Sequence, residues 1–260
     1  MNILEQITAY KKEYIANCKS QKSVRDLERE ELFKRNGVSL TDSLLSVNST
    51  GIIAEFKRKS PSKGIINNTA QVEAVTKAYA ENGASGVSVL TDELFFGGSK
   101  NDFLKTRDLI EIPLLRKDFM IDEYQFIEAK AWGADVVLLI AAILSPRQVR
   151  DFTNLSHDLS MQVLLELHDE TELDHVYHEV DMVGINNRNL KTFEVDIEQS
   201  IRMANYLDKD FTKIAESGIS SIETLKYFKN NGFQGFLMGE YFMKNMNPAH
   251  AFKDFISFLY

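Results

Sequence analysis

The sequence predicts a (β/α)8 barrel, and three observations lead to that fold class. Eight short apolar runs recur along the chain, and stretches of helical length separate them. Three of the junctions repeat one pattern, in which a helical stretch stops at a glycine and an apolar run follows. The length of 260 residues also suits a single barrel of this kind. A doubly wound open sheet is the runner-up, because it is built from the same alternation.

The apolar runs have the length and composition of strands that are buried on both faces of a parallel sheet. We expect strands over residues 52–57, 86–91, 114–118, 136–140, 163–167, 182–186, 213–216 and 235–239. In three junctions Gly83, Gly133 and Gly232 stand where a helix would end. A glycine is typical of that place, because a helix C-cap needs a positive φ.

The stretches between the runs carry apolar residues at helical spacing. Val72, Val75 and Tyr79 predict a helix over residues 72–79, and a similar pattern predicts another over 124–131. Three candidate starts support this interpretation. Proline follows Ser145 and Asn247, which suits the first helical position, and residues 220–223 spell a capping box that begins with Ser220.

Residues 1–48 precede the alternation and are also predicted to be helical. Their apolar side chains form a possible stripe, made of Leu4, Ile7, Tyr10, Tyr14 and Ile15. Such a stripe favours a segment packed against the barrel rather than a loose tail. We therefore expect one barrel domain over residues 1–260, in which residues 1–48 are an N-terminal helical extension that covers the bottom or the flank.

Composition excludes several classes of function. The net charge of −8 disfavours binding to nucleic acid or to an acidic membrane surface. Cys18 is the single cysteine, so neither an intrachain disulfide nor a cysteine metal site is expected, and a cytoplasmic setting fits best. Residues 1–14 lack the apolar core of a signal peptide, and no apolar stretch approaches the length of a membrane span.

Polar residues gather where the predicted strands end. Glu55 and Lys57 are two apart and therefore share one face of their strand. Alone, this pair fits a salt bridge and a catalytic site equally well, because a buried ion must be paired or functional. Other strands end in further charged or polar groups, namely Arg116, Lys117, Asp118, Glu166, His168, Asn186, Asn187, Arg188, Glu216 and Ser217.

Together, these residues favour an active site more strongly than any one of them does alone. In a closed barrel the ends of all strands meet at one mouth, so lysines, an arginine and three glutamates would share one cavity. Structural pairing rarely needs so many ions in one place, and we therefore expect an active site there. The strand that ends at residue 140 is the exception, since apolar residues follow it.

The ends of the last two strands are suited to an anion. Gly218 and Gly239 would let main-chain N–H groups approach a phosphate, with Glu240 next in the chain and Lys57 as a counter-charge. His168 is interpreted as a rim or structural histidine rather than an acid or base. The histidines show no metal-ligand spacing, and no dinucleotide or P-loop motif is present, so no metal or cofactor is expected.

Several of these segments resemble the indole-3-glycerol phosphate synthase family along nearly the whole barrel. The similar segments are residues 53–57, 60–64, 88–92, 95–99, 116–119, 166–168, 184–190, 216–219 and 238–240. The resemblance implies ring closure of 1-(2-carboxyphenylamino)-1-deoxyribulose 5-phosphate to indole-3-glycerol phosphate, with loss of carbon dioxide and water, in tryptophan biosynthesis. It implies a small-molecule substrate, no cofactor and no metal, and we expect a monomer.

The resemblance also implies roles for particular residues. Lys117 would protonate the ketone oxygen of the substrate, while Glu166 and Glu55 would be the acid/base pair of the dehydration. Lys57 and Arg188 would hold the two anionic ends of the substrate. The remaining implied site residues orient groups, line the ring or close a loop over the mouth, and they are Asn186, Glu216, Ser217, Phe96, Phe119, Leu190 and Ser60. Gly97 and Tyr241 depart from the family pattern at the rim, and neither has an implied chemical role.

Two other functions remain as alternatives. Phosphoribosylanthranilate isomerase uses a cysteine and an aspartate at strand ends, whereas Cys18 lies in the N-terminal extension. A non-catalytic phosphosugar-binding barrel would be expected to lose the acid or the base, yet Lys117 and Glu166 are both present.

Overall fold

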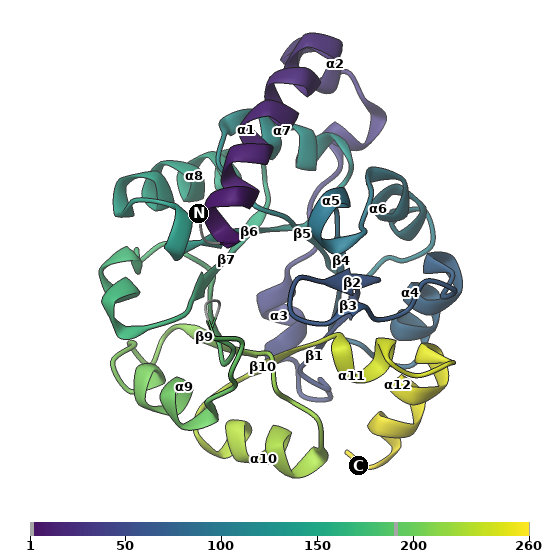
Figure 1. Ribbon diagram of the computed structural model, residues 1–260, viewed down its shortest axis with the longest axis vertical. Helices are drawn as coiled ribbons and strands as arrows, with labels where there is room; N and C mark the ends of the chain where they lie inside the picture. The colour runs from purple at the N-terminus through teal and green to yellow at the C-terminus, as the bar shows by residue number, and fades with distance from the viewer. Residues whose placement is uncertain (1–2, 190–191, 260) are drawn as a thin grey trace.

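Eight parallel strands close into a barrel in the computed structural model, which describes residues 3–189 and 192–259 (Figure 1). Around the barrel the strands follow the order β1-β10-β9-β8-β7-β6-β5-β4. Their bounds are β1 Ile52–Phe56, β4 Gly86–Leu90, β5 Leu114–Lys117, β6 Val136–Ile140, β7 Gln162–Leu167, β8 Met182–Asn186, β9 Thr212–Glu216 and β10 Gly235–Met238. The predicted (β/α)8 barrel is confirmed. The open sheet is wrong, because β1 pairs with both β4 and β10.

Helices surround the barrel and connect its strands (Figure 1). The longer ones are α4 Val72–Glu81, α6 Lys100–Arg107, α7 Glu123–Ala131, α8 Pro146–Asp158, α9 Ile197–Ala204, α10 Ile222–Asn230 and α12 Pro248–Ser257. Shorter elements follow several strands, namely the hairpin of β2 Lys59–Ser60 and β3 Gly64–Ile65, α5 Glu93–Phe96, η2 Ala141–Ile143, η3 Glu170–His175 and α11 Glu240–Met243.

The helix starts agree with the sequence at two of three places. Ser145 and Asn247 cap α8 and α12, and each is followed by proline at the first helical position. The capping box that was predicted at Ser220 is wrong, because the side chain of Ser221 caps α10 by accepting from the N–H of Thr224. The two serines are adjacent, so the sequence allows either start, and only the packed helix decides between them.

The N-terminal extension consists of α1 Ile3–Gln21, α2 Val24–Leu27, η1 Glu31–Lys34 and α3 Leu40–Leu45. The expected position is right for α3, since Leu40 and Leu44 are buried against the starts of the strands. A Cβ added at Gly86, the first residue of β4, would lie 2.7 Å from Leu40 Cδ1. This short helix therefore closes the bottom of the barrel.

Helix α1 packs on the flank against α7, as expected, but its N-terminal part also reaches the mouth, which was not expected. The ammonium of Lys11 lies 3.1 Å from the Asp92 carboxylate and 2.6 Å from the Asp118 carboxylate. Both carboxylates follow strands at their C-terminal ends, beyond β4 and β5. Figure 1 shows α1 running outward from the rim beside α7, while α3 is seen inside the ring. An apolar stripe shows that a helix packs, but it does not say at which end of the barrel.

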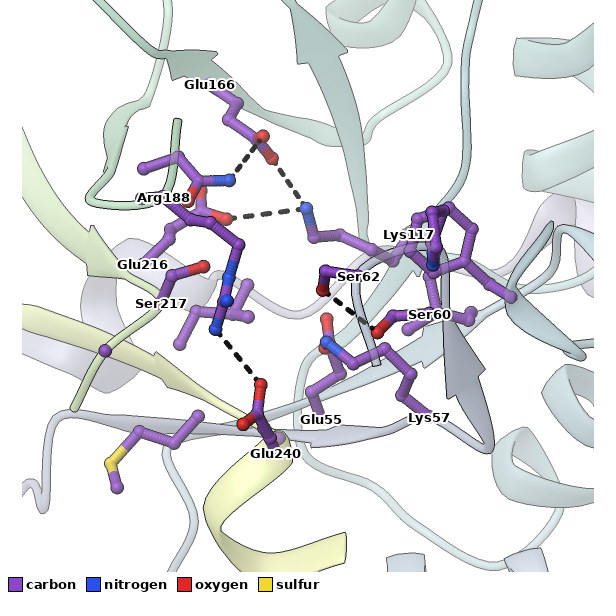
Figure 2. Close-up of a pocket in the computed structure, with 18 of the residues that line it drawn as sticks. Glu55, Lys57, Ser60, Ser62, Lys117, Glu166, Arg188, Glu216, Ser217 and Glu240 are labelled. Carbon is purple, nitrogen blue, oxygen red and sulfur yellow. Dashed lines mark hydrogen bonds and ion pairs between the residues drawn. The ribbon is translucent and has the colours of Figure 1, made fainter. Parts of the chain in front are cut away.

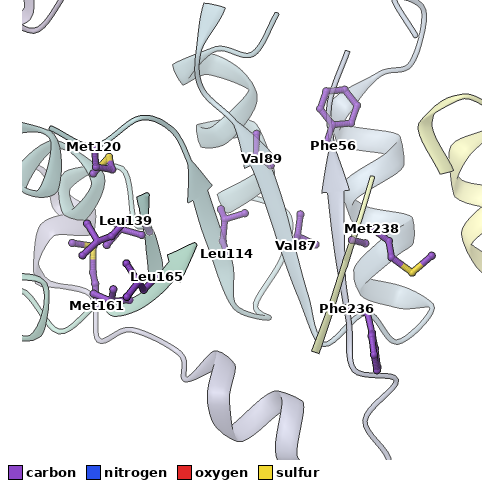
Figure 3. Packing of buried hydrophobic residues seen from close by; sticks show 14 of the residues in the cluster. Phe56, Val87, Val89, Leu114, Met120, Leu139, Met161, Leu165, Phe236 and Met238 are labelled. Carbon is purple, nitrogen blue, oxygen red and sulfur yellow. The ribbon is translucent and has the colours of Figure 1, made fainter. Parts of the chain in front are cut away.

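Strand alternation divides the apolar core into two layers. Outward side chains such as Ala54 and Phe56 pack against the helices, together with the residues of Figure 3. Inward side chains such as Ile53, Leu115 and Leu164 fill the barrel itself. Among the described residues, no helix is both long and apolar enough to cross a membrane.

Candidate active site

A cavity of about 390 Å³ opens at the C-terminal ends of the strands. The structure brings fourteen of the predicted site residues to its wall, namely Glu55, Lys57, Ser60, Phe96, Lys117, Phe119, Glu166, Asn186, Arg188, Glu216, Ser217, Gly218, Gly239 and Glu240. Figure 2 shows many of these side chains converging from different strands. The remaining predicted residue, Leu190, lies outside the described residues.

Four ionisable side chains form the uppermost layer inside the barrel. Glu55, Lys117, Glu166 and Glu216 come from β1, β5, β7 and β9, which are alternate strands of the ring. Side chains from alternate strands share a layer in such a barrel. The same alternation makes the layers below apolar. The sequence thus builds a charged floor to the cavity on an apolar core.

Lys117 lies between two carboxylates of this layer. Its Nζ donates to Glu166 Oε2 at 2.6 Å and lies 3.4 Å from Glu216 Oε2 (Figure 2). Asn186 Nδ2 donates to the other oxygen of Glu166 at 3.0 Å. Two buried carboxylates therefore share one ammonium, and Asn186 orients one of them.

Because the two carboxylates share one ammonium, the three groups differ in their protonation states. Burial alone would lower the pKa of Lys117, but Glu166, Glu216 and Glu55 raise it above its ordinary value, so Lys117 is charged. Burial would raise the pKa of Glu166, but Lys117 and His168 hold it well below its ordinary range. Burial and the adjacent Glu166 carboxylate raise the pKa of Glu216 to about 8. Near neutral pH, Glu166 is an acceptor while Glu216 carries a proton.

Glu55 and Lys57 form an ion pair in the cavity wall. Their charged atoms are 2.7 Å apart, and Glu55 is almost fully buried whereas the Lys57 side chain is partly exposed. A Cβ added at Gly239 would lie 2.8 Å from Glu55 Oε1. The missing side chain of Gly239 therefore makes room for Glu55, a purpose that the sequence did not reveal.

The other side of the cavity carries Arg188 and two residues with positive φ. Arg188 Nη2 lies 3.1 Å from Glu240 Oε2, and Asn186 Oδ1 accepts from the main-chain N–H of Arg188 at 3.0 Å. Ser217 and Gly218 have φ of 65° and 75°. The Glu240 carboxylate is thus already paired and repels anions, so only its main-chain N–H is suited to a phosphate.

An apolar wall faces these charges. The rings of Phe96 and Phe119 lie 5.8 Å apart between their centroids. Sequence reasoning missed further apolar lining residues, among them Leu138 and Ile140 of β6 and Ile3, Leu4 and Ile7 of α1. The absence of a polar residue at the end of β6 could have indicated this wall, since β6 supplies Leu138 and Ile140 to it.

The β2–β3 hairpin lies over the mouth and carries Ser60. Its Oγ lies 3.3 Å from Ser62 Oγ, and both residues line the cavity. At the base of the hairpin, Arg58 Nη2 donates to Asp102 Oδ1 at 3.0 Å. That the hairpin moves to close the cavity stays a prediction.

His168 was interpreted as a rim or structural histidine, and its side chain is in fact only 7% exposed. Its Nε2 lies 2.9 Å from Glu166 Oε1. In the sequence, only the spacing indicated this contact. Residues two apart share one face of a strand, but His168 lies one residue beyond the end of β7.

Comparison with known proteins gives a consistent result. The family model described as indole-3-glycerol phosphate synthase matches residues 4–255. An indole-3-glycerol phosphate synthase of Bacteroides thetaiotaomicron is 44% identical over 255 residues, which cover 98% of each chain. Another, from Bordetella pertussis, is 39% identical and covers 95% of this chain and 96% of its own.

A solved structure shares the fold alone. Thiamine phosphate pyrophosphorylase from Pyrococcus furiosus superposes with a TM-score of 0.59 at 13% identity, covering 84% of this chain and 96% of its own. The similarity between the two chains is therefore one of barrel architecture.

Proposed function

Because the chain belongs to the indole-3-glycerol phosphate synthase family, we propose that the cavity at the strand ends is its active site and that Lys117 is the principal acid. The family consists of carboxy-lyases of tryptophan biosynthesis. They close the ring of 1-(2-carboxyphenylamino)-1-deoxyribulose 5-phosphate and release carbon dioxide and water. The observation that carries the proposal is the buried contact of Lys117 with both Glu166 and Glu216.

The first step is attack of the aromatic carbon that bears the carboxylate on the ketone carbon. The ketone oxygen gains negative charge as this bond forms, and the Lys117 ammonium donates a proton to it. Loss of carbon dioxide then returns an electron pair to the ring and restores aromaticity. The apolar wall around Phe96 and Phe119 favours this loss, because a carboxylate is less stable where water is excluded.

Dehydration needs one group that gives a proton and one that takes a proton. The hydroxyl group made in the first step leaves as water, and a proton leaves the carbon beside the ring nitrogen. Glu166 is suited to take that proton, since it is ionised and lines the cavity. The Glu55–Lys57 pair is suited to protonate the leaving hydroxyl. Over the whole cycle one proton is taken from solvent, which matches the lost carboxylate charge.

Arg188 and main-chain N–H groups around Gly218 and Gly239 are assigned to the anionic ends of the substrate. Support comes from their position in the same cavity. Arg188 is partly exposed and has only Glu240 as a carboxylate partner among the described residues. A phosphate or carboxylate of the substrate would compete for this guanidinium, which is well suited to anions.

Replacing Lys117 tests the assignment. In Lys117→Ala the turnover number should fall by at least about 10³-fold, because the acid for the ring closure is gone. Binding of the substrate, measured by equilibrium titration, should remain within about fivefold, because Lys117 acts on charge that develops only in the transition state. Formation of the indole ring is followed by its absorbance and fluorescence.

Lys77→Ala is the matched control, since Lys77 lies on α4 with a side chain that is 56% exposed. It should keep normal turnover. Near-normal turnover in Lys117→Ala would refute the role of Lys117 as acid. Substrate binding without turnover in the unaltered chain would instead favour the non-catalytic barrel.

The setting of the enzyme is also proposed. A single half-buried cysteine and a net charge of −8 support a monomer in the cytoplasm that binds no nucleic acid. Light scattering coupled to gel filtration should give a mass near the 29.7 kDa of one chain. A doubled mass would refute the monomer.

A further inference from the structure

His168 is a buried titratable residue that the proposed steps do not use. It follows β7 directly and is not among the residues that line the cavity. Most buried histidines are satisfied structural groups. This one differs because the group it contacts is a carboxylate of the cavity floor.

The imidazole lies between two carboxylates. Nε2 is 2.9 Å from Glu166 Oε1, and Nδ1 is 3.7 Å from Glu172 Oε2 on η3. The same Glu172 oxygen accepts from the main-chain N–H of His168 at 2.7 Å, which fixes the backbone. From α9, Gln199 Nε2 donates to the main-chain carbonyl of His168. The ring therefore contacts carboxylates of β7 and η3, while η3 and α9 hold the main chain of His168.

The two carboxylate oxygens of Glu166 face different groups. Oε1 faces His168 and Asn186, while Oε2 faces Lys117 in the cavity. If Oε1 were free, the carboxyl group could rotate and Lys117 could take either oxygen. Two neighbours on Oε1 remove that freedom.

Charge supports the same arrangement. Burial alone would lower the pKa of His168, but Glu166 and Glu172 raise it to about 9. The ring is then an imidazolium at neutral pH, and both of its nitrogens are donors. A cation behind Glu166 favours the ionised carboxylate, which is the form that accepts a proton.

We propose that His168 is a positioning residue, which holds Oε1 of Glu166 from behind and keeps this carboxylate ionised and turned toward Lys117. The proposal rests on the proposed function in one respect, namely that Glu166 is the proton acceptor of the dehydration. His168 itself touches no reacting atom.

Two variants separate the short polar contact with Glu166 from the charge of the ring. His168→Leu removes both, whereas His168→Gln keeps an N–H donor near the place of Nε2 without the charge. In His168→Leu we expect kcat to fall by about 10- to 100-fold, since a misplaced reactive group has effects of that size. KM should change by less than about threefold, because His168 lies outside the cavity lining.

The pH profile carries the specific readout. Without the imidazolium, the pKa of Glu166 rises, so the acid limb of kcat should move up by about one pH unit in both variants. His168→Gln should recover most of kcat at high pH, where Glu166 is ionised anyway. An unmoved acid limb in both variants would overturn the proposal, even if kcat were lower.

His157→Leu is the matched control. His157 also has Nε2 2.9 Å from a carboxylate, that of Asp181, but it lies on the outer helix α8. Its kcat and acid limb should stay those of the unaltered chain. An equal shift in this control would show a general effect of removing a histidine and would also overturn the proposal.

A measurement without substrate distinguishes this proposal from the proposed function. NMR titration of the His168 ring in the unaltered chain should give a pKa well above its ordinary value, and Glu166→Gln should lower it. An ordinary pKa in the unaltered chain overturns the proposal, whereas absence of ring-closing turnover would overturn the proposed function alone.

Discussion

Two buried ion clusters lie side by side at the end of β5, and they differ in how completely their charges are satisfied. The mouth cluster consists of Lys117, Glu166 and Glu216 inside the barrel. The flank cluster lies at the rim beside α1 and α7 and consists of Lys11, Asp92, Arg116, Asp118 and Glu128, of which Asp118 also lines the cavity. Lys117 and Asp118 are neighbours in sequence, yet they belong to different clusters.

The carboxylate of Asp118 has partners on both oxygens. Oδ1 lies 2.6 Å from the Lys11 ammonium and accepts from the N–H of Phe119, while Oδ2 accepts from Thr91 and Arg116. Despite burial, Lys11 and Arg116 hold the pKa of Asp118 far below its ordinary value. This is the arrangement of a structural group, because the Asp118 carboxylate is compensated on both oxygens and stays ionised near neutral pH.

The carboxyl group of Glu216 is the opposite case. Within the described residues, Oε1 is buried without a hydrogen-bond partner, and Oε2 has Lys117 only at 3.4 Å. Its pKa rises accordingly to about 8. A group that titrates near neutral pH costs stability but is useful for proton transfer. Among the described residues of the flank cluster, Asp92 Oδ2 also lacks a hydrogen bond, but it lies 3.1 Å from the Lys11 ammonium. A buried carboxyl oxygen with neither a hydrogen bond nor an ion pair to a described residue therefore marks the mouth cluster as the chemical one.

The largest expected effect is on the free energy of unfolding, which a substitution in the flank cluster should lower and one in the mouth cluster should not. Asp118→Asn should lower the free energy of unfolding by about 3–5 kcal/mol, because Lys11 and Arg116 lose a buried counter-charge. Glu216→Gln should not lower it and should raise it at pH 7 by up to about 3 kcal/mol, because the amide resembles the protonated acid of the folded state but does not ionise in the unfolded chain. Urea unfolding measures both. Equal losses in the two variants would contradict the distinction.

Part of this distinction was open to sequence reasoning. Apolar runs, glycine stops and charged strand ends predicted the barrel and the ring of cavity residues. Strand alternation turns Arg116 and Lys117 to opposite sides, but the sequence does not say what lies on the outer side. There Arg116 meets Glu128 of α7, and Asp118 meets Lys11 of α1. These contacts depend on where helices dock, which is a tertiary property.

The same reason explains why the sequence did not place the start of helix α1 at the mouth. Its apolar stripe predicts a packed face, and Lys11 lies one residue from Tyr10 of that stripe. Nothing local says that this lysine pairs with carboxylates at the mouth. Once it does, Ile3, Leu4 and Ile7 become part of the cavity wall. The buried ion pairs of Lys11 with Asp92 and Asp118, which are distant in the sequence, thus determine that α1 contributes to the cavity wall.

The next effect tests whether the mouth cluster depends on the exact place of Glu216. A Cβ at Gly184 would lie 2.2 Å from Glu216 Oε1, so Gly184→Ala must displace that carboxyl group. We expect kcat to fall by up to about 100-fold. Gly232→Ala is the control, because an added Cβ there has no neighbour within 4 Å although φ is +85°. The control should lose some stability but keep kcat, and a normal kcat in Gly184→Ala would show that Glu216 tolerates movement.

The smallest effect is a difference in how stability depends on pH. Because the pKa of Glu216 is raised from 4.5 to about 8, its stabilising contribution is complete below pH 4.5 and is lost as the pH rises through 8. The free energy of unfolding should therefore fall over this range, by at most about 1.4 kcal/mol per pH unit from this group. The pKa of His168, raised to about 9, extends the decline above pH 6.5.

The flank cluster should not contribute to that slope. The pKa of Asp118 is lowered, so its contribution is present above the ordinary value of 3.8 and disappears only in acid. Urea unfolding between pH 5 and 8 should thus give a flatter curve for Glu216→Gln. Asp118→Asn should shift the whole curve down and leave its slope unchanged. If Glu216→Gln kept the original slope, Glu216 would carry no proton in this range, and the mouth cluster would be as fully compensated as the flank cluster.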